Sequence, residues 1–216
     1  GVGVRVLVDG TWGFASTGEA SVSAVTHAIG RARAAARASA GLRRERIESL
    51  PPVALATGDF VGEGVDAVLG MSLEQRVALA VAVEARARAA SPRVNSASGT
   101  YNEIFEEKAI VTSDGADVSF KLVRPELYVA AVAERDGQLS RVSESVGVTG
   151  GWDCLFRNAP EAVADKAART AVDLLDAKAP EGGRTTVIMA PSIVGLLVHE
   201  AVGHTVEADF VQSGSV

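Results

Sequence analysis

Residues 108–146 read KAIVTSDGADVSFKLVRPELYVAAVAERDGQLSRVSESV, and this stretch decides the fold class. It contains short runs in which apolar and polar residues alternate: Lys108–Thr112, Val118–Leu122, Tyr128–Glu134 and Leu139–Val146. Residues typical of turns separate these runs, at Ser113-Asp114-Gly115, Arg124-Pro125 and Asp136-Gly137. Alternation interrupted by turn residues is typical of strands joined by tight connections. The stretch therefore predicts a meander of antiparallel strands.

A further strand pair is predicted at the beginning of the chain. Residues Val2–Val8 place valine at every second position, and Asp9-Gly10 supplies a hairpin turn before Thr11–Ala15. A bare pair of strands is marginally stable in water, so it usually belongs to a larger sheet. We therefore expect sheet partners upstream of these residues.

Long helices are predicted on either side of the meander. The Ala-rich segment Ala20–Ala40 follows a capping sequence at Ser16–Glu19 and ends at Gly41. Ser72 is a good N-cap for a helix that runs to about Ala90, because Gln75 three residues later completes a capping box.

The apolar residues of this second helix, Val77 and Val81 among them, are expected to form one broad face. Asn158–Glu161 starts a third helix, with Pro160 in the first turn, where its missing N–H is not needed. Helices of this kind beside an antiparallel meander predict an α+β fold, with long helices packed on antiparallel sheet.

The last part of the chain is expected to contain a buried strand and a final helix. Thr185–Met189 is rich in β-forming residues, and Pro191-Ser192 opens the helix. The apolar run Ile193–Val198 is expected to hold this helix in a core.

Composition describes an ordinary globular chain of 216 residues, 47% hydrophobic and 22% charged. No run approaches the roughly 18 apolar residues of a membrane span, and no signal-peptide pattern is visible. The net charge of −6 argues against a nucleic-acid partner. The single cysteine, Cys154, allows no internal disulfide and fits a reducing cytoplasm. A cytoplasmic protein with no membrane or nucleic-acid partner is expected.

Two of the three histidines lie with a glutamate in one window, His199-Glu200-Ala201-Val202-Gly203-His204. Neutral imidazoles bind Zn²⁺ and leave a position for water, whose pKa the metal lowers to about 7. A carboxylate beside the ligands can take the proton as general base. The window therefore indicates zinc-dependent hydrolysis, with His199 and His204 as candidate ligands and Glu200 as candidate base.

The spacing of the two histidines requires an irregular helix. They are five positions apart, which in a regular helix places them about 140° apart around the axis. Either an i→i+5 bulge brings them together or the helix ends between them. Gly203 is the position where such a distortion is easiest. The alternative is that the histidines lie on different helix faces, one in the core and one in solvent, and share no metal.

Residues Leu197–Phe210, LVHEAVGHTVEADF, resemble the HExxxH block of the TldD/PmbA family of metallopeptidases. The opening residues GVRV (Gly3–Val6) and DGTWGFA (Asp9–Ala15) are similar to that family's glycine-and-aromatic hairpin. Because the two blocks occur in the right order, the chain is identified as a central fragment of a TldD-like, HExxxH-containing member.

The resemblance implies a zinc-dependent peptidase that acts on short or unfolded peptides, in degradation or maturation. It carries His199 and His204 over as zinc ligands and Glu200 as general base. The family's third ligand is a cysteine in a C-terminal domain, a role that Cys154 does not inherit. The implied division is an α+β domain over 1–190, incomplete at its start. Residues 191–216 would form the motif helix and the start of a C-terminal β-rich domain.

Other candidate ligands stay open. Glu207 and Asp209 are candidates for a direct ligand, for support of a ligand, or for capping and surface roles. His27 is a candidate ligand or an exposed residue of the first helix.

The resemblance also implies a related, metal-free partner subunit. Apolar surface left uncovered in this fragment predicts a dimer or larger assembly, which a homo-oligomer would also satisfy. The alternative function is a non-catalytic subunit or assembly scaffold, because no third ligand is evident. The intact His199-Glu200 and His204 motif argues against that alternative for the parent protein, whereas this fragment alone is expected to be inactive.

Overall fold

The alternating valines at the start of the chain form the predicted hairpin. The computed structural model describes residues 1–42, 46–157 and 159–215. In it, strand β1 (Val2–Val8) pairs antiparallel with β2 (Thr11–Thr17). Asp9 and Gly10 make the turn with positive φ angles of 50° and 72°, as a type I′ hairpin requires.

Small residues allow this hairpin to pack directly on helix α1 (Val22–Ala40). The buried face of the helix consists of alanines one turn apart: Ala28, Ala32, Ala36 and Ala40. A Cβ on Gly13 of β2 would lie 1.9 Å from the carbonyl oxygen of Ala32. Glycine at this position therefore sets how closely strand and helix approach.

The first helix begins later than its sequence predicted. Ser21 is the N-cap, and its Oγ accepts a hydrogen bond from the Ala24 N–H at 3.2 Å. The cap predicted at Ser16–Glu19 is wrong, because β2 continues to Thr17. The predicted end at Gly41 is confirmed.

The second predicted helix is confirmed as α3 (Leu73–Ala89), with the complete capping box of Ser72 and Gln75. Its predicted apolar face is wrong in part, because Val77 and Val81 are exposed. The residues that α3 buries are Val83 and Ala87. The third helix, α5 (Pro160–Asp173), begins at Pro160 as predicted, whereas Asn158 lies outside the described residues.

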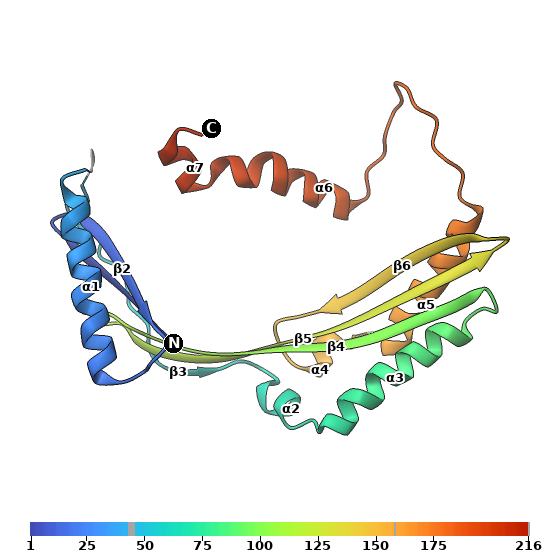
Figure 1. Ribbon diagram of the computed structural model, residues 1–216, viewed down its shortest axis with the longest axis horizontal. Coiled ribbons are helices and arrows are strands. Elements are labelled where there is room, and N and C mark those ends of the chain that lie inside the picture. The colour runs from blue at the N-terminus through green and yellow to red at the C-terminus, as the bar shows by residue number, and fades with distance from the viewer. Residues whose placement is uncertain (43–45, 158, 216) are drawn as a thin grey trace. The chain divides into compact units, whose positions relative to one another are not determined.

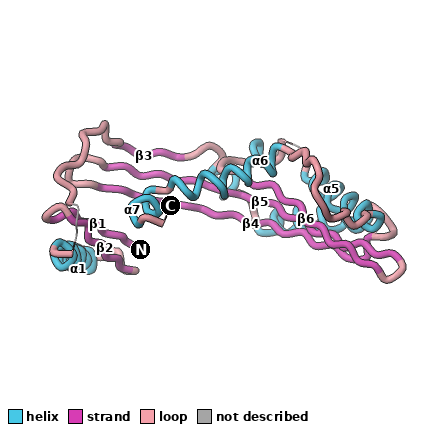
Figure 2. Tube along the Cα trace, turned by 90° about the horizontal axis from the view of Figure 1, so that it is seen from above, coloured by secondary structure: helices cyan, strands magenta, loops and turns pink. Residues whose placement is uncertain are grey.

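The meander consists of β4 (Val94–Val111), β5 (Asp117–Arg135) and β6 (Gln138–Gly147). The turns predicted at 113–115 and 136–137 are confirmed, with Asp136 and Gly137 at positive φ. The short strand β3 (Thr57–Val61) adds a parallel pair to β5. Figure 2 shows β4, β5 and β6 lying side by side.

The turn predicted at Arg124-Pro125 is wrong, because β5 continues through both residues. Pro125 lies between two pairings: β3 pairs with 117–121 of β5, and β6 pairs with 126–135. A proline can be accommodated where a strand changes partner, since its missing N–H then interrupts neither ladder. Pro125 is fully buried there.

The described chain forms two compact units. The first comprises 1–70, 103–125 and 148–154, so it contains the β1–β2 hairpin and α1. It also holds a small core of Val65, Val68 and Val123 with Trp152, supplied in part by α2 (Val65–Leu69) and α4 (Trp152–Leu155).

The second unit, comprising 71–102, 126–147 and the residues from Leu155 onward, contains the larger core. There α3 and α5 pack together and α5 packs on β6 (Figure 1). Buried residues at its centre include Val83, Leu127, Val129, Ala164, Ala168 and Leu175. Arg86 of α3 donates to both carboxylate oxygens of Asp165 of α5, at 2.7 and 2.8 Å. The α+β fold with helices packed on sheet is confirmed.

The chain after the 3-10 turn Leu174–Asp176 differs most from the sequence prediction. Thr185–Met189 forms no strand, and Ile188 is 96% exposed. A β-forming sequence needs a neighbouring strand, and these residues pair with none of the described strands. The domain boundary expected at residue 190 stays a prediction. No helix in the described ranges is long and apolar enough to span a bilayer.

We predict that Gly13→Ala destabilises the hairpin–helix unit by about 1–3 kcal/mol or more, because the new methyl would overlap the α1 backbone. Urea denaturation measures this loss. Gly18→Ala is the matched control, since no atom lies within 4 Å of a Cβ placed there. Equal unfolding midpoints for the two variants would contradict the close packing.

A pH-dependent contribution to stability is predicted at Glu106. Lys108 lies 2.6 Å and Arg124 2.7 Å from its two carboxylate oxygens. These hydrogen bonds lower the pKa of Glu106 from 4.5 to about 2, and the bond from Lys108 has the larger effect.

Because the folded pKa lies below the unfolded one, this contribution is present above pH 4.5 and is lost as the pH falls towards about 2. The stability difference between wild type and Glu106→Gln should therefore shrink over that window, which denaturation at several pH values measures. A difference that stays constant would show that the carboxylate is not held ionised by these partners.

Candidate metal centre

The histidine motif lies where one helix changes its winding. Helix α6 (Pro191–Val198) begins at Pro191, as predicted, and leads directly into a π-helical segment, His199–Gly203. In this segment the N–H of His204 donates to the carbonyl oxygen of His199. This i→i+5 hydrogen bond is the bulge that the five-residue spacing required, and it confirms one of the two alternatives.

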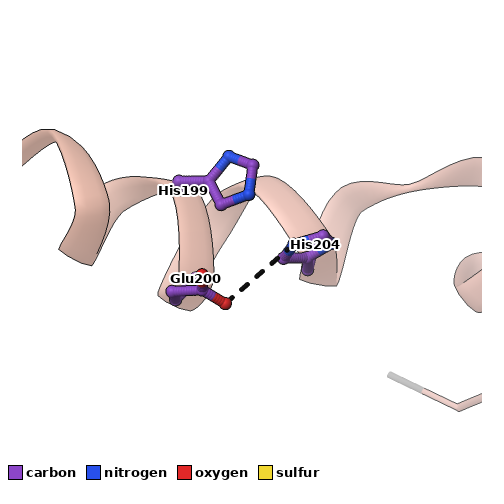
Figure 3. Close-up of side chains that lie close together, drawn as sticks. All are labelled: His199, Glu200 and His204. Carbon is purple, nitrogen blue, oxygen red and sulfur yellow. Dashed lines mark ion pairs between the residues drawn. The ribbon is translucent and has the colours of Figure 1, made fainter. Parts of the chain in front are cut away.

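The bulge brings the two imidazole rings together. The ring centroids of His199 and His204 lie 4.6 Å apart, with an angle of 81° between the ring planes. In a regular α-helix the two side chains would point about 140° apart. The alternative in which the histidines occupy opposite helix faces is therefore wrong for this structure (Figure 3).

Glu200 completes a group of potential metal ligands. Its Oε2 lies 4.0 Å from Nε2 of His204, an interaction drawn as the dashed line in Figure 3. One donor atom from each of His199, Glu200 and His204 lies within 4.8 Å of the others. Within the described ranges, this is the group of histidine, cysteine and acidic side chains whose geometry could hold an ion.

The donor set fits zinc. Imidazole nitrogens and a carboxylate oxygen are ordinary zinc ligands, and two nitrogens on one tetrahedral ion lie about 3.4 Å apart. The donor atoms of the whole group, that of Glu200 included, lie within 4.8 Å of one another. All three side chains are exposed, so rotations about their own bonds can adjust these distances to an ion.

The backbone at Gly203 does not require a glycine. Its φ and ψ angles of −55° and −57° are open to any residue. A Cβ there would make an ordinary contact with the Val198 carbonyl oxygen at 3.8 Å. The side chain of Thr205, which the sequence prediction missed, supports this segment. Its Oγ1 lies within hydrogen-bonding distance of the Val202 and Ala201 carbonyl oxygens, at 3.0 and 3.3 Å.

The remaining candidate ligands have different surroundings from one another. Oε1 of Glu207 lies 2.9 Å from Nδ1 of His204, whereas Oδ1 of Asp209 accepts a bond from the Phe210 N–H. His27 is an exposed residue of α1 and Cys154 is half-buried. None of these four belongs to the group of possible metal ligands found among the described residues.

The apolar residues of α6 are exposed, contrary to the expected core position. Each of Ile193, Val194, Leu196, Leu197 and Val198 is at least 40% exposed. Every residue from Asp176 to Val211 is exposed as well. The geometry of the motif is therefore set by local hydrogen bonds rather than by packing within the described chain.

Comparison with known proteins shows the family of the chain. The PmbA/TldA metallopeptidase central domain matches residues 66–175, just over half of the chain, and domain 1 of the same family matches residues 1–36. The metalloprotease of Methanothermobacter thermautotrophicus is 28% identical over 99% of this chain and 45% of its own length. The zinc metalloprotease TldD homolog of Saccharolobus solfataricus is 24% identical over the whole chain and 46% of its length. The chain thus spans about half the length of these relatives.

Solved structures share the fold. A protein of Bacteroides thetaiotaomicron, named as a candidate modulator of DNA gyrase, has a TM-score of 0.70 over 93% of this chain and 45% of its own, at 13% identity. A Thermotoga maritima protein named in the same way has a TM-score of 0.63, with 20% identity, over 84% of this chain and 39% of its own. At these identities the likeness concerns the fold alone. The family matches, however, span enough of the sequence to show that this chain belongs to the PmbA/TldD metallopeptidase family.

Proposed function

We propose that this chain supplies the zinc-binding histidines and the general base of a peptidase. The observation that carries the proposal is the π-helical bulge, which gathers donor atoms of His199, Glu200 and His204 within 4.8 Å. Membership of a metallopeptidase family supports the reaction class, and the name of the Saccharolobus solfataricus relative supports zinc.

The three residues have distinct roles in the proposed reaction. His199 and His204 would hold the ion, which would supply a Lewis acid and lower the pKa of water to about 7. Glu200 accepts a proton from the attacking water and returns it to the leaving amine. Its carboxylate lies beside Nε2 of His204, at 4.0 Å, so it is close to the space that the ligands surround.

A third protein ligand is needed for a typical catalytic zinc site. Glu207 is a poor candidate, because its carboxylate contacts the other nitrogen of the His204 ring. As the family resemblance implies, we expect a cysteine from the part of the protein that these 216 residues do not include. The relatives are about twice as long as this chain, which leaves room for it.

The proposed substrates are short or unfolded peptides. An extended, accessible backbone can reach a site whose residues are all exposed, whereas most peptide bonds of a folded protein are held in secondary structure. The exposed apolar residues of α6 next to the motif offer contacts to substrate side chains or to a partner subunit.

A second candidate function is a non-catalytic subunit or assembly scaffold. The observation that favours it is the exposed apolar surface of α6, Ile193–Val198, which suits a subunit interface better than a free surface. The intact pair His199 and His204 favours the catalytic function, because a scaffold has no need for convergent metal ligands.

We predict that the purified protein that contains this chain binds zinc near one equivalent per chain, and that His204→Ala abolishes this binding. Elemental analysis after purification without chelators measures the content. His27→Ala is the matched control, since it removes the remaining histidine of the chain from an exposed helix position. Zinc retained in His204→Ala, or lost in His27→Ala, would contradict the proposed centre.

We predict that Glu200→Gln lowers kcat for peptide cleavage by about 10²–10⁴-fold while zinc stays bound, because the general base is lost and both imidazoles remain. Cleavage of a fluorogenic peptide by the protein that contains this chain, with zinc content measured in parallel, provides the test. Unchanged cleavage in the variant would exclude Glu200 as the base. Zinc binding without cleavage in the wild type would favour the scaffold function.

A further inference from the structure

We propose that Glu207 is a positioning residue that fixes the tautomer and the ring direction of His204, so that Nε2 is left free for the metal. The inference rests on the proposed zinc function for its purpose. Its structural content, a carboxylate that selects one tautomer of one histidine, can be tested without metal.

The contact distinguishes the two nitrogens of the ring. Nδ1 of His204 lies 2.9 Å from Oε1 of Glu207, whereas Nε2 faces Glu200, whose Oε2 is 4.0 Å away. An ionised carboxylate can only accept a hydrogen bond. A carboxylate in this position therefore favours the tautomer with the proton on Nδ1, which leaves the lone pair on Nε2, on the side of the other candidate ligands.

The backbone builds this contact. After the π-helical segment the chain tightens into a 3-10 turn, His204–Val206, in which side chains three positions apart are eclipsed. The Glu207 N–H lies 3.4 Å from the carbonyl oxygen of His204 and closes the turn. The tight winding of this turn therefore places Glu207 next to His204. In the same way, the π-helical bulge places His204 next to His199.

Glu207 does not make the contact that its place in the chain would suggest. It is the N-cap of helix α7 (Ala208–Ser213), yet its side chain accepts no hydrogen bond from that helix. N-cap side chains commonly accept from the N–H groups of the first turn. The carboxylate is directed at His204 instead, whereas that of Asp209 bonds the adjacent backbone. The two acidic residues of this segment thus differ in role.

Support of this kind has a known magnitude. Loss of a residue that holds the second nitrogen of a ligating histidine weakens metal affinity by about 10–100-fold. Here His204 and Glu207 have side chains that are 45% and 46% exposed, so water competes for the same hydrogen bond. We therefore expect an effect near the lower limit, about 10-fold.

The first test measures the tautomer in metal-free protein. The ¹⁵N chemical shifts of the His204 ring are recorded at a mildly alkaline pH for the full chain and three variants. We expect the proton on Nδ1 in the wild type and in Glu207→Gln, whose amide oxygen still accepts. It should shift toward Nε2 in Glu207→Ala. Asp209→Ala is the matched control, since it removes a carboxylate two residues away, and it should resemble the wild type.

The second test measures zinc affinity by competition with a chromophoric chelator. We expect Glu207→Ala to bind Zn²⁺ about 10-fold more weakly, Glu207→Gln to recover much of the loss, and Asp209→Ala to match the wild type. An unchanged tautomer in Glu207→Ala overturns the inference, whatever the zinc affinity. So does a tautomer shift accompanied by unchanged zinc affinity.

The two proposals fail in different ways. Wild-type protein that binds no zinc contradicts the proposed function, whereas the tautomer measurement still decides the role of Glu207. Equal zinc affinity in the wild type and in Glu207→Ala refutes the positioning role and leaves the zinc centre standing.

Discussion

One hydrogen bond governs the candidate site, that from the His204 N–H to the carbonyl oxygen of His199. This bond spans five residues instead of four. As a result, two side chains that would diverge in a regular helix point toward the same space. The 3-10 turn that follows is wound more tightly than an α-helix, and it places Oε1 of Glu207 2.9 Å from Nδ1 of His204. Two consecutive changes of winding thus bring the side chains of His199, Glu200, His204 and Glu207 together within one short segment.

Packing contributes little to the geometry of this segment. The larger core lies among α3, α5 and the sheet, and the described residues from Asp176 to Val211 are exposed. Local hydrogen bonds take the place of packing: Thr205 Oγ1 approaches the Ala201 and Val202 carbonyl oxygens, and the bulge supplies its own.

Features set by neighbouring residues could be predicted from the sequence. The hairpin turn at Asp9-Gly10, the capping box of Ser72 and Gln75, and the bulge required by the five-residue spacing are of this kind. Features that depend on distant partners could not. Pro125 continues a strand because β5 exchanges β3 for β6 there. Thr185–Met189 stays irregular because no described strand pairs with it. The role of Glu207 depends on a 3-10 turn that spacing alone does not reveal.

The convergence of His199 and His204 on one ion is the central claim, and X-ray absorption at the zinc edge tests it most directly. The measurement uses the zinc-loaded His27→Ala protein, in which these are the remaining histidines of the chain. We predict the multiple-scattering pattern of two imidazoles, with Zn–N distances of about 2.0–2.1 Å. A spectrum with one imidazole or none would contradict the account, because the bulge would then bring the rings together without a shared metal.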